Sequence, residues 1–133
     1  MTVSDLRTNL AANIASITGL RTAAVVPSDP KPPIAVVMPN SITFDTAFAR
    51  GLDEYEFVVL VIVGKVDDRT AQNALDGYCN PTGALSIKTA IERDKSLGGQ
   101  AQTLRVTTMR NYAALSIAEN TYLAAEFTVQ VYA

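Results

Sequence analysis

The sequence predicts a single α+β domain spanning residues 1–133, with an antiparallel four- to five-stranded sheet and helices packed on one face. Two observations lead to this prediction. Apolar residues recur at helical or strand spacing in the order α-β-β-β-α-α-β-β. Short turns separate most of the consecutive strands, which favours antiparallel pairing, and three helices suffice to cover one face of such a sheet.

The first half of the chain contains one helix and two short strands. Apolar residues at helical spacing predict a helix from about Ser4 to Ile17, with Ser4 as its N-cap. The β-branched stretch 22–26 is predicted as the first strand. Residues 34–38 form the second predicted strand, and we expect Pro39 to end it because proline cannot donate to a strand ladder.

The strand predicted over Glu54–Val63 is the strongest in the sequence, because every residue from Phe57 to Val63 is apolar. A strand that is apolar on both faces requires both faces to be covered. Helices account for one face. Two alternatives remain for the second face: the tail of this chain or a neighbouring subunit covers it, or a loop such as Asn40–Arg50 folds over it.

The second half of the chain is predicted to hold two helices and two strands. Asp67 or Asp68 is a suitable cap for the first helix. The second is marked by Ala84, Leu85, Ile87 and Ile91. In the following strand the apolar residues change from even to odd positions, which predicts a bulge or break near 110–112. Residues 122–132 alternate regularly and predict the closing strand.

Composition argues against an enzyme. The chain has no histidine and one cysteine, which excludes Ser-His-Asp and Cys-His catalysis and most zinc sites. The carboxylate pairs Asp53/Glu54 and Asp67/Asp68 lie at predicted strand and helix ends, where acids are usually solvated or capping. Cys79 is more consistent with packing than with nucleophilic catalysis. We therefore expect no catalytic residue, no cofactor and no metal.

Charge and hydropathy limit the partners. The net charge is −2, and no run of Lys or Arg suggests a surface that grips nucleic acid through its phosphates. The longest apolar run is far too short to cross a bilayer, so we expect no membrane partner.

An ordered set of short motifs extends from Ala71 to Ala133, with a related segment upstream. Its members are Leu75-Asp76 with Tyr78 on a helix, a Pro/Gly break, Ser86-Ile87 opening a helix, Leu97-Gly98-Gly99, a strand with Tyr112, and a closing strand with Tyr122, Ala125-Glu126-Phe127 and Val129, preceded upstream by Phe44-Asp45 and Arg50-Gly51-Leu52-Asp53. In this order the motifs resemble the tail terminator proteins of long-tailed, non-contractile phages, especially those infecting actinobacteria. The resemblance covers nearly the whole chain, although no single motif is diagnostic.

That resemblance implies a structural role in the virion. Tail terminators form a ring, typically a hexamer, that caps the head-proximal end of the tail tube and stops its polymerisation. The implied partners are further copies of the chain, the tail tube protein and the head-to-tail connector or stopper protein. DNA would pass through the lumen without specific binding, and assembly would take place in the host cytoplasm.

Ring formation requires two different patches on each subunit, because its interfaces are heterologous. We expect the irregular segment between the second and third strands to provide one of them, with Ile42, Phe44, Phe48 and Arg50 at the subunit interface. Two other functions stay open from the sequence. One is a head-completion or stopper connector protein, and the other is a small α+β ligand-binding or enzymatic domain.

Overall fold

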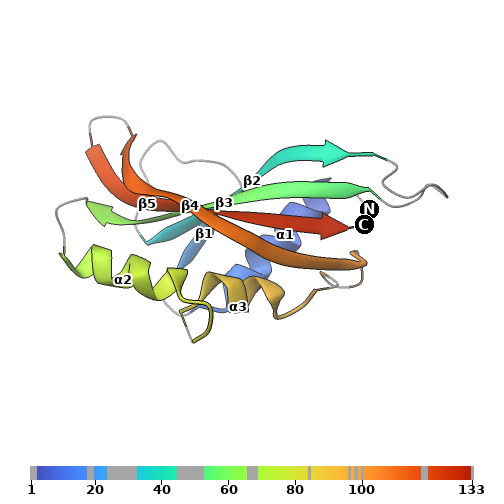
Figure 1. Ribbon diagram of the computed structural model, residues 1–133, viewed down its shortest axis with the longest axis horizontal. Helices are drawn as coiled ribbons and strands as arrows, with labels where there is room; N and C mark the ends of the chain where they lie inside the picture. The colour runs from blue at the N-terminus through green and yellow to red at the C-terminus, as the bar shows by residue number, and fades with distance from the viewer. Residues whose placement is uncertain are drawn as a thin grey trace.

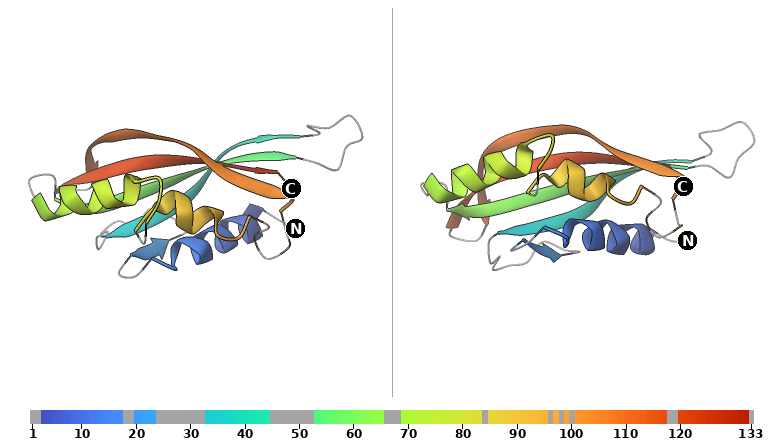
Figure 2. Two further views of the ribbon diagram at one scale, coloured as in Figure 1. Left: turned by 60° about the horizontal axis from the view of Figure 1, so that its bottom comes forward. Right: turned by 90° about the horizontal axis from the view of Figure 1, so that it is seen from below.

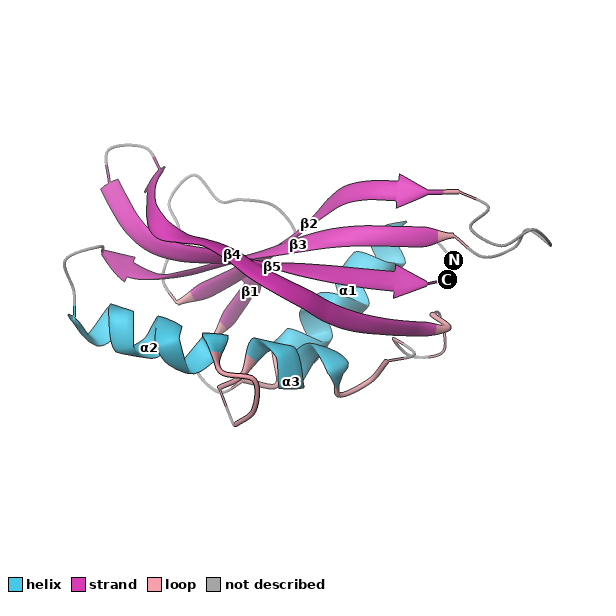
Figure 3. Ribbon diagram, viewed as in Figure 1, coloured by secondary structure: helices cyan, strands magenta, loops and turns pink. Residues whose placement is uncertain are grey.

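The computed structural model describes residues 3–17, 20–23, 33–44, 53–65, 69–83, 85–95, 97, 99, 101–117 and 120–132. These residues form three helices and five strands (Figures 1 and 3). The elements are α1 (Val3–Ile14), β1 (Arg21–Ala23), β2 (Ile34–Thr43), β3 (Glu54–Lys65), α2 (Arg69–Cys79), α3 (Ile87–Glu92), β4 (Thr103–Ile117) and β5 (Asn120–Tyr132). The predicted α+β class and the order α-β-β-β-α-α-β-β are confirmed.

The strands form one sheet in the order β1-β2-β3-β5-β4. The prediction of a purely antiparallel sheet is wrong, because β1 pairs with β2 in parallel, while the β2–β3, β3–β5 and β4–β5 pairs are antiparallel. The reason lies in the connection. Residues 24–33 separate β1 from β2, and a segment of that length lets the chain return to the same end of the sheet, which a two-residue hairpin does not allow.

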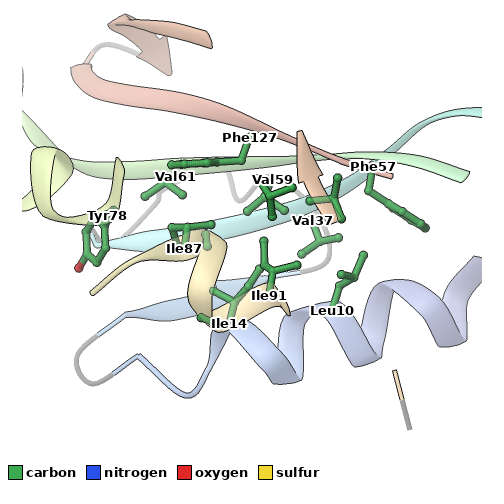
Figure 4. Close-up of a cluster of buried hydrophobic side chains, with 14 of the residues drawn as sticks. Leu10, Ile14, Val37, Phe57, Val59, Val61, Tyr78, Ile87, Ile91 and Phe127 are labelled. Carbon is green, nitrogen blue, oxygen red and sulfur yellow. The ribbon is translucent and has the colours of Figure 1, made fainter. Parts of the chain in front are cut away.

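Helices α1, α2 and α3 lie on one side of the sheet (Figure 2). Their apolar side chains pack against those of β2, β3, β4 and β5 that point the same way, and together they form the main core. Figure 4 shows its centre, where Ile14 and Ile91 lie beneath Val37, Val59 and their neighbours. Leu10, Ile14, Phe57 and Ile91 are all fully buried. Predicting helices on one face is therefore correct for the part of the chain that is described.

The sheet face turned away from the helices, here called the second face, carries a smaller apolar cluster. Val36 and Ile62 are both 0% exposed there, and Leu60 is 8% exposed. Tyr122 and Ala124 of β5 belong to the same cluster. The apolar second face of β3 is thus buried within a single chain, and its composition alone does not require a neighbouring subunit.

Strand β2 continues past Pro39, so the expectation that this proline ends the strand is wrong. The ladder with β3 shifts register between Pro39 and Ser41 and then resumes as far as Thr43, which pairs with Glu54. Proline is tolerated at such an irregularity because the ladder there does not depend on a regular series of N–H donors. The same strand pair thereby extends well beyond the segment that the sequence predicted.

The predicted irregularity near residues 110–112 of β4 is confirmed. The β4–β5 register shifts between Arg110 and Ala113, and again between Val106 and Thr108. Asn111 has a φ of 55°, in the left-handed region that asparagine tolerates better than most residues. The two shifts together return the strand to its original phase, so Ala113 shares the second face with Ala124.

Helix ends differ in detail from the sequence prediction. Ser4 lies inside α1 and is not its N-cap, and the helix ends at Ile14 rather than Ile17. The last turn tightens, with Ile17 N–H donating to the Ile14 carbonyl at 3.0 Å. A clear cap occurs instead at Ser86, whose Oγ accepts a hydrogen bond from Thr89 N–H at 3.2 Å at the start of α3.

Candidate assembly surfaces

The C-terminal end of β2 and the N-terminal end of β3 form a two-stranded projection, here called the arm. It is made of Pro39–Thr43 with the adjoining Phe44, and of Glu54–Phe57. In both views of Figure 2 these strand ends extend beyond the helices. The ladder holds the arm together, and Ser41 Oγ donates to the Glu56 carboxylate at 3.0 Å across it. Because the helices do not cover its end, the arm exposes more side-chain surface than the centre of the sheet.

The structure places two of the four predicted interface residues on or beside the arm. Ile42 pairs with Tyr55 and is partly buried on the helix side of the sheet. Phe44 follows the last paired residue and is 69% exposed, the highest value among the large hydrophobic side chains in the described part of the chain. Phe48 and Arg50 lie outside the residues that the structure describes.

A hollow of about 250 Å³ lies on the second face, next to the arm. Its lining residues come from four neighbouring strands: Met38, Pro39 and Asn40 of β2, Val58 of β3, Glu126 of β5 and Arg110 of β4. The hollow therefore extends across the second face from β2 to β4. We call this feature the second-face hollow.

The second-face hollow has an apolar floor and a charged wall. Val58 is 7% exposed and pairs with Met38 across the ladder. The Arg110 Nε lies 3.6 Å from the Glu126 carboxylate, and Asn111 Nδ2 donates to the same carboxylate at 3.1 Å. Arginine has five N–H donors, so the Arg110 guanidinium, whose side chain is 55% exposed, retains the capacity to bind a further acceptor.

Charges are distributed unevenly between the arm and β4. The arm carries Glu54 and Glu56, which point to the second face because they alternate with Tyr55 and Phe57. On β4, Arg105 and Arg110 pair with Gln130 and Glu126 and share that face. The arm side of the second face is therefore acidic and the β4 side basic.

A second, smaller hollow of about 160 Å³ lies between the end of α2 and β4, and it contains Cys79 and Met109. Burial, and secondarily the negative charge of Asp76, raises the pKa of the Cys79 thiol to about 11. A thiol with so high a pKa is a poor nucleophile at neutral pH. This arrangement agrees with the packing role that the sequence favoured for Cys79.

Two further polar contacts tie helices to β4. Tyr112 donates its phenol to the Asp76 carboxylate at 2.7 Å. Burial first, and then the bond to Asp76 and its charge, raise the pKa of Tyr112 to about 12. Glu92 accepts a hydrogen bond from Val106 N–H at 3.0 Å and pairs with Lys88. Both contacts hold the helix layer against β4.

The carboxylate pairs found in the sequence do not form a metal site in the described part of the chain. Asp53 and Glu54 lie at the start of β3, whereas Asp67 and Asp68 fall outside the described residues. Across the described ranges there is no cluster of three or more Cys, Asp or Glu side chains that could hold a metal ion. None of the described helices combines the length and apolarity needed to cross a membrane.

Residues of the second-face hollow were not predicted as site residues. Arg110 and Glu126 lie 16 positions apart in the sequence, and only the β4–β5 register brings them together. The change of apolar phase near Arg110 was the available signal, because a bulge re-aims neighbouring side chains.

A scan of protein-family models gives no match to this chain, and a search of curated protein sequences gives no significant match.

Proposed function

We propose that the chain is a structural virion protein that acts as a tail terminator of a long-tailed, non-contractile phage. Copies of it close into a ring, which the family resemblance implies to be a hexamer. The ring caps the head-proximal end of the tail tube, stops tube polymerisation and joins the tube to the head connector.

The exposed arm ending at Phe44 is the observation that carries this proposal. A large apolar side chain that is 69% exposed at the end of a projecting ladder is a common feature of protein interfaces, which are enriched in aromatic residues. The second-face hollow adjoins the arm at Pro39 and Asn40 and extends across the sheet to Arg110, so it differs from Phe44 in being a partly charged depression. Two unlike surfaces are what a heterologous, ring-closing association uses, whereas a two-fold dimer uses one surface twice.

The doubly apolar strand β3 gives weaker support than its sequence promised. Its side chains Val59 and Ile62 are both 0% exposed in the single chain, so they are not available to a neighbour. Support for the proposed ring therefore comes from the projecting end of the sheet and not from its centre.

The test is assembly in the presence and absence of the tail tube protein. Native mass spectrometry of the purified chain at micromolar concentration is expected to show one closed oligomer, alone or after addition of tube protein. Electron microscopy is expected to show that oligomer at one end of each tube, with shorter tubes as its concentration rises. A strict monomer in both samples contradicts the proposal.

The alternative of a stopper or head-completion protein is separated by partner choice. A tail terminator binds the tube protein, whereas a stopper binds the portal-side adaptor. Matched co-sedimentation with each partner therefore distinguishes them, and binding to the adaptor alone would reassign the chain to the connector.

A further inference from the structure

We propose that the arm of one copy docks on the second face of the next copy, with Phe44 entering the second-face hollow. This inference rests on the proposed ring and names the contact that builds it. The occupant of the hollow is thus a second copy of this chain.

The apolar parts of the two surfaces correspond. Among the described residues, Phe44 is the most exposed of the large hydrophobic side chains, and it directly follows the last paired residue of β2 in the arm. The second-face hollow has a volume of about 250 Å³ and a floor that includes Val58 and Met38. Aromatic side chains bury about 150–250 Å² each and dominate interface energetics when they fill such hollows. Association would remove Phe44 from water.

The charges of the two surfaces are also complementary. The arm presents Glu54 and Glu56 on the second face, and β4 presents Arg105 and Arg110. Within one chain Glu56, Gln130 and Arg105 lie in one row across three strands. Glu56 and Arg105 are therefore two strand spacings apart, roughly 10 Å, which is too far for a direct ion pair. An arm from a second copy would bring acids and bases of this kind together.

Charge complementarity also selects a direction. An acidic arm is attracted to the basic β4 side of the next copy, whereas arm against arm places Glu54 and Glu56 against the same residues. Like charges in contact disfavour a wrong pairing. When this arm-to-β4 contact is repeated from copy to copy, it gives the head-to-tail order from which a ring closes.

The first experiment removes the apolar anchor. Phe44→Asp is compared with Leu85→Asp, a matched control at another exposed large hydrophobic residue, which is 41% exposed next to α3. Sedimentation velocity is expected to show a dissociation constant raised on the order of thirtyfold for Phe44→Asp, as for an interface hot spot. Leu85→Asp should assemble like the wild type. Equal assembly of all three proteins overturns the inference.

The second experiment reverses charges and does not depend on Phe44. One variant carries Glu54→Arg with Glu56→Arg, and the other carries Arg105→Glu with Arg110→Glu. Each alone has arm and face of like charge, so each is expected to stay monomeric with an unchanged circular dichroism spectrum. Mixed one to one, they are expected to form an oligomer in which the two variants alternate, because each arm then meets a face of opposite charge.

The outcomes separate this contact from the proposed function. A wild-type ring that caps tubes, combined with no rescue on mixing, overturns the docking mode and leaves the terminator function standing. A wild-type chain that never forms a ring overturns both. If Phe44→Asp abolishes only binding of the tube protein while rings persist, the occupant of the hollow is not a second copy, and the inference is wrong.

Discussion

Glu92 holds α3 against the edge of the sheet, and its removal gives a sharp test of the structure. Its side chain, which is 18% exposed, pairs with Lys88. It also accepts a hydrogen bond from Val106 N–H at 3.0 Å, at the point where β4 shifts register. Burial alone would raise the pKa of Glu92. The bonds from Lys88 and Val106 and the charges of Lys88 and Lys95 outweigh burial and keep that pKa below its ordinary value.

Two substitutions separate the hydrogen bond from the charge. Glu92→Ala leaves the Val106 N–H without its acceptor in a partly buried position, so the free energy of unfolding should fall by about 2 kcal/mol. Glu92→Gln keeps an amide oxygen that can accept from Val106 N–H. It loses mainly the attraction to Lys88, whose side chain is 42% exposed, so its cost should be only about 0.5 kcal/mol.

The effect should depend on pH in a defined direction. Because the pKa of Glu92 is lowered in the folded chain, its stabilisation is fully present above the unfolded value. It is lost as the pH falls below about 4.3, through the folded pKa. Urea unfolding followed by circular dichroism at pH 7 and pH 3 measures this. A Glu92→Ala protein within about 0.3 kcal/mol of the wild type at pH 7, or a difference that grows in acid, would refute the reasoning.

Three further predictions concern single side chains. The pKa of the Cys79 thiol is about 11, so at pH 8 only roughly a thousandth of it is thiolate. Cys79 should therefore react with Ellman's reagent on the order of a hundredfold more slowly in the folded protein than in urea. Equal rates in the two conditions would contradict its burial. Tyr112→Phe should lower the unfolding free energy by at most about 1 kcal/mol, since its bond to Asp76 is exposed. The substitution should also remove the tyrosine that titrates near pH 12 in an ultraviolet absorbance titration, and an unchanged titration curve would argue against this assignment. The stabilising contribution of the Tyr112 phenol is present below pH 10 and is lost as the pH rises through 12. Asn111→Val should cost about 1–2 kcal/mol in thermal or urea unfolding because Asn111 has a φ of 55°, whereas Asn111→Gly should cost less, and the reverse order would argue against the bulge.

The element order was predictable because apolar spacing reports local structure. The alternation of residues 122–132 follows the pleat of β5, and the change of phase near Arg110 marked a real bulge. Pro39 misled the prediction because its effect depends on whether the strand pair around it continues. The Pro39/Ser41 register shift and the renewed pairing with β3 absorb the proline, and neither is visible in the residues that flank it.

The parallel β1–β2 pair could not be predicted for a related reason. Strand direction depends on where the connection of residues 24–33 returns to the sheet, and sequence spacing gives only its length. The arm was anticipated in part, since Phe44 was expected at an interface and is 69% exposed. The second-face hollow was not anticipated, because Val58, Arg110 and Glu126 meet only through the pairing of three strands.

Strand β4 has a consequence for how concentrated solutions of this protein behave. It is a long strand, Thr103–Ile117, and it lies at one edge of the sheet. A regular edge of that length is a template for adding strands from other chains, and so for amyloid-like aggregation. Two register shifts interrupt it, and the Val106 N–H is already engaged by Glu92. These two features hinder the addition of strands from other chains along the β4 edge.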